Sequence, residues 1–296
     1  MLRFVFFILL LGVICFIPRT EIAPNPAHGD AALKKINDRH GGTMFSSKEY
    51  PYYDREDFSS LKIYTVKDHT QLIHPENGLG SKQHPKLTKK VVTHEKLWQR
   101  FKAVIPERIR EDVKEFEIST DGHSNYYGSV SPLNFIQTQW RLSFDIQDFT
   151  YDKKLSYNVI VHEAAHLIGF DDSQHNNTAK SYCTNYQILE RCANDEAYTQ
   201  LFYKQFWTKE MVEESYANAY DSVEHRSYAS TKNFVTPYAM HNVDEDFAES
   251  FSYFIFSKRP TDFKKIKHQK IEFFYQFEEL VELRNELLHN IERDYR

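Results

Sequence analysis

The stretch Asn158-Val-Ile-Val-His-Glu-Ala-Ala-His-Leu-Ile-Gly169 decides how this chain is organised, because it places three ionisable side chains inside an apolar pattern. Positions i and i+4 lie on the same face of an α-helix, so His162 and His166 can approach one metal ion. Glu163 then lies beside the same opening. Two imidazoles and a neighbouring carboxylate at this spacing are typical of a catalytic zinc site.

A metal-free interpretation of the same motif is a buried polar cluster. Two desolvated imidazoles and a buried glutamate would then each need a partner, which is costly in an apolar setting. The apolar residues around the motif recur at helical spacing, between Asp152 as a predicted N-cap and Gly169 as a predicted stop. We therefore favour a metal site on an amphipathic helix.

A tetrahedral zinc site needs a third protein ligand and leaves its fourth position to water. One candidate is Asp172, which completes the string His162-Glu-x-x-His166-x-x-Gly169-x-x-Asp172 of the metzincin type. The other is Glu245, near the start of a predicted helix over Asn242–Ser257. Glu249 lies one turn further on and would accept the free ring N–H of a ligating histidine.

The sequence Tyr238-Ala-Met-His-Asn-Val-Asp-Glu-Asp-Phe-Ala-Glu-Ser-Phe251 resembles the second motif of the lethal-factor-like gluzincins. This group of zinc metallopeptidases includes the catalytic domain of anthrax lethal factor and the Pro-Pro endopeptidases. The motif His162-Glu-Ala-Ala-His166 is similar to their first motif. The resemblance covers roughly residues 156–255, and the cysteine-containing segment 175–235 departs from it.

The resemblance implies a role for each matching residue. It implies that His162, His166 and Glu245 hold Zn²⁺ and that Glu249 supports a ligand. Glu163 would be the general base, and Tyr238 would donate a hydrogen bond to the oxyanion, a role that follows from the resemblance alone.

We therefore expect a zinc-dependent endopeptidase that hydrolyses peptide bonds of a protein or peptide substrate with a metal-activated water. Three alternatives remain open at this point. The first is a metzincin-type peptidase with Asp172 as the third ligand. The second is a non-catalytic exported protein that binds zinc or peptide, and the third is an exported protein in which the motif is accidental.

The composition suits a globular enzyme. The chain has 296 residues, of which 41% are hydrophobic, so it can bury a sizeable core. The formal net charge is −5, and the basic residues are scattered along the sequence. No basic stripe is available for a phosphate backbone, so nucleic-acid binding is not expected.

The N-terminus predicts export. Residues 1–18 combine a short basic start with an apolar run and indicate a signal peptide, with an uncleaved membrane anchor as the alternative. Residues 19–55 are rich in turn-forming and charged residues and suggest a linker or flexible arm before a metallopeptidase domain at 56–296. A secreted, periplasmic or cell-envelope location agrees with a disulfide between Cys183 and Cys192.

The expected fold class is α+β and zincin-like, with a small twisted sheet packed on the active-site helix and a mostly helical second half. Strands are predicted at Leu61–Val66, Phe116–Thr120 and Arg141–Ile146. Helices are predicted over Thr93–Val113 with an interruption at Pro106, and over Glu196–Ala217, Asn242–Ser257 and Lys267–Arg296. Arg141–Ile146 is the expected edge strand that would pair with an extended peptide.

Overall fold

The computed structural model describes residues 23–45, 55–124, 126–176, 182–188, 190–217, 226–230 and 232–295. The predicted signal peptide or anchor at 1–18 lies outside these residues. Among the helices that are described, none combines the length and the apolar character that a bilayer crossing requires.

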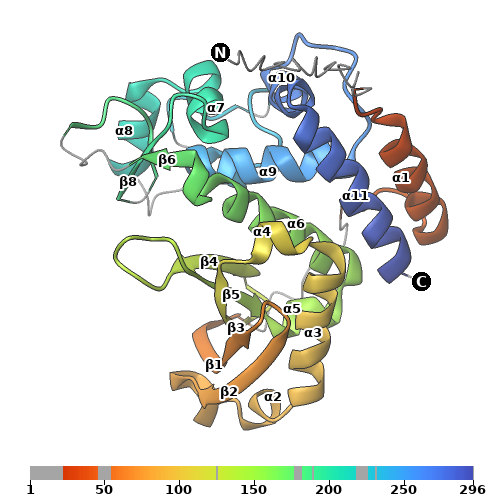
Figure 1. Cartoon of the computed structure of the whole chain (residues 1–296), viewed down its shortest axis with the longest axis vertical. Coiled ribbons are helices and arrows are strands. Elements are labelled where there is room, and N and C mark those ends of the chain that lie inside the picture. The colour runs from red at the N-terminus through yellow and green to blue at the C-terminus, as the bar shows by residue number, and fades with distance from the viewer. Residues whose placement is uncertain are drawn as a thin grey trace, which may run out of the picture.

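One half of the molecule is built on a five-stranded mixed sheet (Figure 1, lower part). The strands are β1 (Arg55–Lys67), β2 (Gln71–Asn77), β3 (Val113–Gly122), β4 (Gly128–Pro132) and β5 (Trp140–Asp145), in the order β2-β1-β3-β5-β4. Only β3 and β5 run parallel, and the other neighbours are antiparallel. Helices together with this small mixed sheet are compatible with the α+β class that the sequence predicted.

The predicted edge strand is wrong. β5, which covers the predicted Arg141–Ile146 except for its last residue, pairs with β3 on one side and with β4 on the other. It is buried along most of its length, which suits an interior strand. The edge on this side is β4, whose sequence Gly-Ser-Val-Ser-Pro carries little strand propensity and ends in the proline that edge strands tolerate.

The helices of this half follow β2 and β5 in the chain. They are the short η1 (Leu79–Lys82) and α2 (Pro85–Thr88), then α3 (Val91–Val104), α4 (Glu107–Arg110) and α5 (Ile146–Tyr151). α3 ends before Pro106, where the sequence predicted an interruption. Aromatic rings of α3 and the sheet form the core between them, with the centroids of Trp98 and Phe116 5.2 Å apart.

The other half is helical (Figure 1, upper part). Its helices are α1 (Ala27–His40), α6 (Lys153–Gly169), α7 (Tyr198–Phe206), α8 (Lys209–Ala217), α9 (Val243–Phe256), α10 (Ile266–Phe273) and α11 (Glu278–Asp294), with short turns η2 (Asp172–Gln174), η5 (Tyr238–Met240) and η6 (Phe274–Gln276). α6 packs directly on α9 and also contacts β4. It is the element that joins the sheet to the helical half.

Local sequence sets the ends of α6 and α9. The side chain of Asp152 accepts a hydrogen bond from the Lys154 backbone N–H at 2.8 Å and caps α6, which ends at Gly169 as predicted. Asn242 caps α9 by accepting from the Glu245 N–H at 2.9 Å. The predicted capping box is only half correct, because the Glu245 carboxylate points to the histidines of α6 instead of back to the cap.

Two predicted helices are broken. Glu196–Ala217 divides into α7 and α8 at Trp207, which adopts an extended backbone and donates from its indole Nε1 to buried Asp246 at 2.8 Å. Lys267–Arg296 divides at Phe277, also extended, so that α10 and α11 turn around an aromatic cluster. Tertiary contacts of single aromatic residues thus override helical periodicity at both places.

The prediction of a linker over 19–55 does not hold for residues 27–40. They form α1, whose Ala32, Leu33 and Ile36 are buried, and α1 packs against α11. The Arg284 guanidinium of α11 donates to the Asp30 carboxylate at 2.7 Å. A weakly amphipathic helix is stabilised here by docking rather than by its own sequence.

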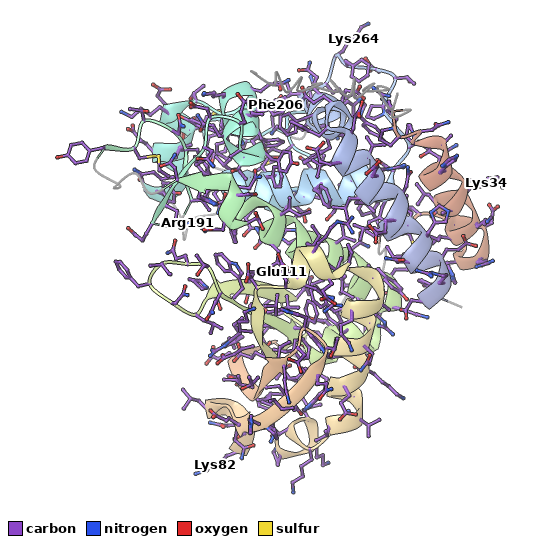
Figure 2. All side chains as sticks on the ribbon, in the orientation of Figure 1. Lys34, Lys82, Glu111, Arg191, Phe206 and Lys264 are labelled. Carbon is purple, nitrogen blue, oxygen red and sulfur yellow. A yellow bond between two sulfur atoms is a disulfide. The ribbon has the colours of Figure 1, made fainter. Side chains whose placement is uncertain are left out.

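A second, three-stranded sheet lies beside α7 and α8. Its strands are β6 (His175–Asn176), β7 (Gln187–Ile188) and β8 (Arg191–Ala193), in the order β6-β8-β7. The predicted disulfide is confirmed, since Cys183 and Cys192 are bonded with their Cα atoms 5.6 Å apart (Figure 2). The bond fastens the connection before β7 to β8.

Candidate metal centre

α6 and α9 bring three potential ligands to one point. Nε2 of His162 lies 3.1 Å from Oε2 of Glu245 and 3.2 Å from Nε2 of His166. Nε2 of His166 lies 3.5 Å from the same carboxylate oxygen. Ligand atoms that surround a tetrahedral zinc at about 2.1 Å stand about 3.4 Å from one another. The donor types and their spacing therefore fit a zinc ion.

The protonation pattern of His162 also fits a cation. Its Nδ1 lies 2.9 Å from Oε1 of Glu249, and because a carboxylate accepts hydrogen bonds, Nδ1 carries the proton. In the neutral ring Nε2 then has no proton and can only accept a hydrogen bond. It faces the Glu245 carboxylate oxygen, which is also an acceptor. Only a proton or a metal ion between them removes this conflict.

Burial and neighbouring charges have opposite effects on the pKa values of the cluster residues. Burial alone would lower the pKa of His162, but Glu245 and Glu249 outweigh it and raise that pKa well above its usual value. Burial would raise the pKa of Glu245, but His166 and His162 bring it down to below its usual value. The carboxylate of Glu245 is thus kept ionised, which is the form that ligates a metal.

Glu249 extends the cluster into the protein. Its Oε2 accepts a hydrogen bond from the Thr236 hydroxyl at 2.7 Å, and that hydroxyl oxygen accepts from the Ala239 N–H at 3.1 Å. The chain Thr236–Glu249–His162 fixes the orientation of one imidazole. Thr236 was missed at the sequence level, because nothing local marks a threonine nine residues before Glu245.

Glu163 lies at the buried side of the cluster. It is 4% exposed, and burial raises its pKa. Its Oε2 is buried and has no hydrogen-bond partner among the described residues. A Cβ atom placed on Gly128 would stand 3.1 Å from Glu163 Oε1, so the start of edge strand β4 lies against this carboxylate. The glycine is what allows the strand to come so close.

Tyr238 lies on the solvent-exposed side of the cluster. It is 47% exposed, and its ring centroid lies 5.9 Å from that of His162. Partial burial and the surrounding Glu245 and Glu163 raise its pKa, so the phenol is protonated and able to donate a hydrogen bond. The short turn η5, directly before α9, carries it.

Asp172, the alternative third ligand, lies elsewhere. It lies in η2 with its side chain 73% exposed, and its carboxylate pairs with Arg191, which Figure 2 labels, at 2.5 Å. α6 ends at Gly169 without a turn back toward the cluster. The group of potential ligands that contains the two histidines is completed by Glu245 and does not include Asp172, so the metzincin-type alternative is not supported.

Tyr186 of the disulfide-bonded region contacts a residue next to the site. The Tyr186 hydroxyl donates to the carboxylate of Asp244 at 3.2 Å, next to the candidate ligand Glu245. Burial raises the pKa of Asp244 to about 7. No local sequence pattern indicates this contact, because it depends on how residues far apart in the chain pack.

No family model matches the chain, and no curated protein or solved structure shows a significant similarity to it.

Proposed function

We propose that this chain is a zinc-dependent endopeptidase of the gluzincin type, with His162, His166 and Glu245 as the metal ligands. The observation that carries the proposal is the tetrahedral spacing of these three donors from α6 and α9. Support comes from Glu249 behind one ligand and from Glu163 beside the cluster. The zincin-like fold is part of the same proposal.

Bound zinc would supply a Lewis acid and lower the pKa of a bound water from its high bulk value to about 7. Glu163 has a buried carboxylate oxygen with no partner among the described residues, so it is placed to take a proton from water and to return it to the leaving amine. Burial raises the pKa of Glu163, which makes its carboxylate a better proton acceptor than an exposed glutamate.

Tyr238 is assigned to the oxyanion. Its protonated hydroxyl is a donor at the opening of the site, where negative charge develops on the carbonyl oxygen during attack. An extended peptide substrate would lie along edge strand β4, which has an unpaired side in the described sheet and begins beside Glu163.

A non-catalytic zinc-binding protein is the second candidate. A structural zinc site is closed by four protein ligands. The described residues bring three ligands together here, and a structural site has no need of a buried glutamate with an unused oxygen. These two features favour the enzyme.

The proposed location is outside the cytoplasm, in the cell envelope or secreted. The Cys183–Cys192 disulfide supports it, since such bonds persist in oxidising compartments. Membrane association is proposed only through residues 1–18, should they remain attached.

The decisive experiment measures metal and turnover together in the purified chain. We expect one equivalent of zinc and cleavage of members of a quenched fluorescent peptide library. Glu245→Gln should lose most of the zinc, whereas Asp172→Asn should keep it. Glu163→Gln should keep the zinc and lose at least about 100-fold in rate.

Three other results would contradict part or all of the proposal. Cleavage by Glu163→Gln at the parental rate would remove the base from the mechanism. Full zinc with no cleavage of any library member would leave the zinc-binding protein as the function. Absence of stoichiometric zinc in the folded parent would sink the proposal.

A further inference from the structure

A second group of potential ligands lies at the end of the sheet, apart from the histidine cluster. Asp121, Asp145 and Asp148 each offer a carboxylate oxygen, and these oxygens lie within 4.8 Å of one another. All three residues are buried, being 5%, 0% and 0% exposed. The parallel strands β3 and β5 end side by side, which brings Asp121 and Asp145 together, and Asp148 follows on α5.

Backbone amides occupy most of the carboxylate oxygens. Asp145 caps α5, and its Oδ2 accepts from the Asp121 N–H at 2.7 Å. Asp121 accepts from the N–H groups of Ser124 and Tyr126 in the turn that follows β3. These bonds hold the two carboxylates in place, and Oδ2 of Asp145, which accepts the Asp121 N–H, keeps a second lone pair for a ligand.

Asp148 is different, because one of its oxygens is unused. Its Oδ1 lies 2.9 Å from Nδ1 of His123. Its Oδ2 is buried with no hydrogen-bond partner among the described residues. A buried carboxylate oxygen without a partner costs free energy unless a proton or a cation meets it.

The charges around the three carboxylates also indicate a bound cation. No lysine or arginine of the described residues pairs with Asp145 or Asp148. Three ionised carboxylates this close repel one another strongly unless a positive charge lies between them.

We infer that Asp121, Asp145 and Asp148 form a binding site for a divalent cation that prefers oxygen ligands, with calcium as the ion of choice. Calcium binds oxygens at 2.3–2.6 Å, so oxygens of its shell on opposite sides stand about 4.8 Å apart, and its flexible shell accepts water or backbone carbonyls as further ligands. Zinc prefers nitrogen and sulfur donors and would select the histidine cluster instead.

The site would brace the turn between β3 and β4. Asp121 binds the N–H groups of this turn, and the turn leads to Gly128 beside Glu163. A cation that neutralises the three carboxylates would therefore hold the start of edge strand β4 in place. The inference does not depend on the proposed peptidase function.

Calcium binding can be tested by equilibrium dialysis of the full chain against 1 mM CaCl2, with calcium and zinc both measured by mass spectrometry. We expect one calcium in the parent and none in Asp148→Asn, which removes the charge but keeps the shape and leaves the α5 cap intact. Asp112→Asn, at the other end of β3, is the matched control and should bind as the parent does. Glu245→Gln should lose zinc and retain calcium.

Thermal unfolding is a second, independent test of calcium binding. Calcium should raise the melting temperature of the parent by several degrees and leave that of Asp148→Asn unchanged. Without calcium, Asp148→Asn should be at least as stable as the parent, because a repelling charge is gone. No calcium in the folded parent, or equal calcium in Asp148→Asn, would overturn the site, whatever the zinc content.

Discussion

Glu249 Oε1 lies 2.9 Å from His162 Nδ1, the ring nitrogen that does not face the other candidate ligands. This single contact sets the tautomer of the ring and directs its Nε2 toward Glu245 and His166. Ligand orientation at the centre is therefore controlled by a residue that does not itself reach the metal position.

Glu249→Ala should weaken zinc binding by about 10- to 100-fold, because His162 loses the partner that orients it. Glu249→Gln should retain most of the affinity, since its amide oxygen still accepts the ring N–H. Competition with a chromophoric chelator measures both values. Equal affinity of the alanine variant and the parent would show that His162 needs no such support.

Tyr238→Phe should lower kcat by roughly 100-fold while KM and zinc content stay close to the parental values, because the lost hydrogen bond forms only as charge develops. Steady-state kinetics on a peptide identified in the library provide the measurement. Tyr182→Phe, at a residue that is 79% exposed, is the control. A rise in KM with kcat unchanged would instead make Tyr238 a substrate-binding residue.

His175 should make stability depend on pH. Burial lowers its pKa to about 4, so below its ordinary pKa of about 6.5 the unfolded chain binds a proton that the folded chain does not. Stability is therefore lost as pH falls from about 6.5 to 4, by about 2 kcal/mol at pH 5. Urea unfolding at pH 7 and pH 5 should show a smaller loss in His175→Gln. The same loss in both proteins would assign it to other groups.

Lys270 and Asp246 form a buried ion pair, with Nζ and Oδ2 2.6 Å apart and both side chains at most 1% exposed. Lys270→Met should reduce the free energy of unfolding by about 3–5 kcal/mol, because it leaves a buried carboxylate without its counter-charge. Adding Asp246→Asn should recover much of this loss. Lys34→Met, on the exposed face of α1, should change little (Figure 2). Urea denaturation measures all four proteins.

The candidate ligands could be predicted because their geometry is local. His162, Glu163 and His166 lie within two turns of one helix, and helical spacing fixes how they are arranged. Glu245 and Glu249 are likewise one turn apart, and the apolar residues around them on α9 indicated an inward face. The contact between the two helices was the only long-range feature that had to be predicted. It was inferred because a zinc site needs a third protein ligand.

The remaining features depend on contacts that no local pattern encodes. β4 is short and rich in glycine and serine, so its pairing with β5 became visible only in the folded chain. The break at Trp207 depends on a hydrogen bond to Asp246. Asp121 and Asp145 are far apart in sequence, and the parallel pairing of β3 with β5 makes them neighbours.

The ligands of the candidate centre come from two helices that the whole disulfide-bonded region separates in the chain. An ion shared by α6 and α9 would therefore act as a removable cross-link, as a disulfide does for its two cysteines, but one that chelation can open and metal supply can close. Zinc availability would then govern the lifetime of the folded chain as well as its chemistry, and unfolding after metal loss should begin where these two helices part.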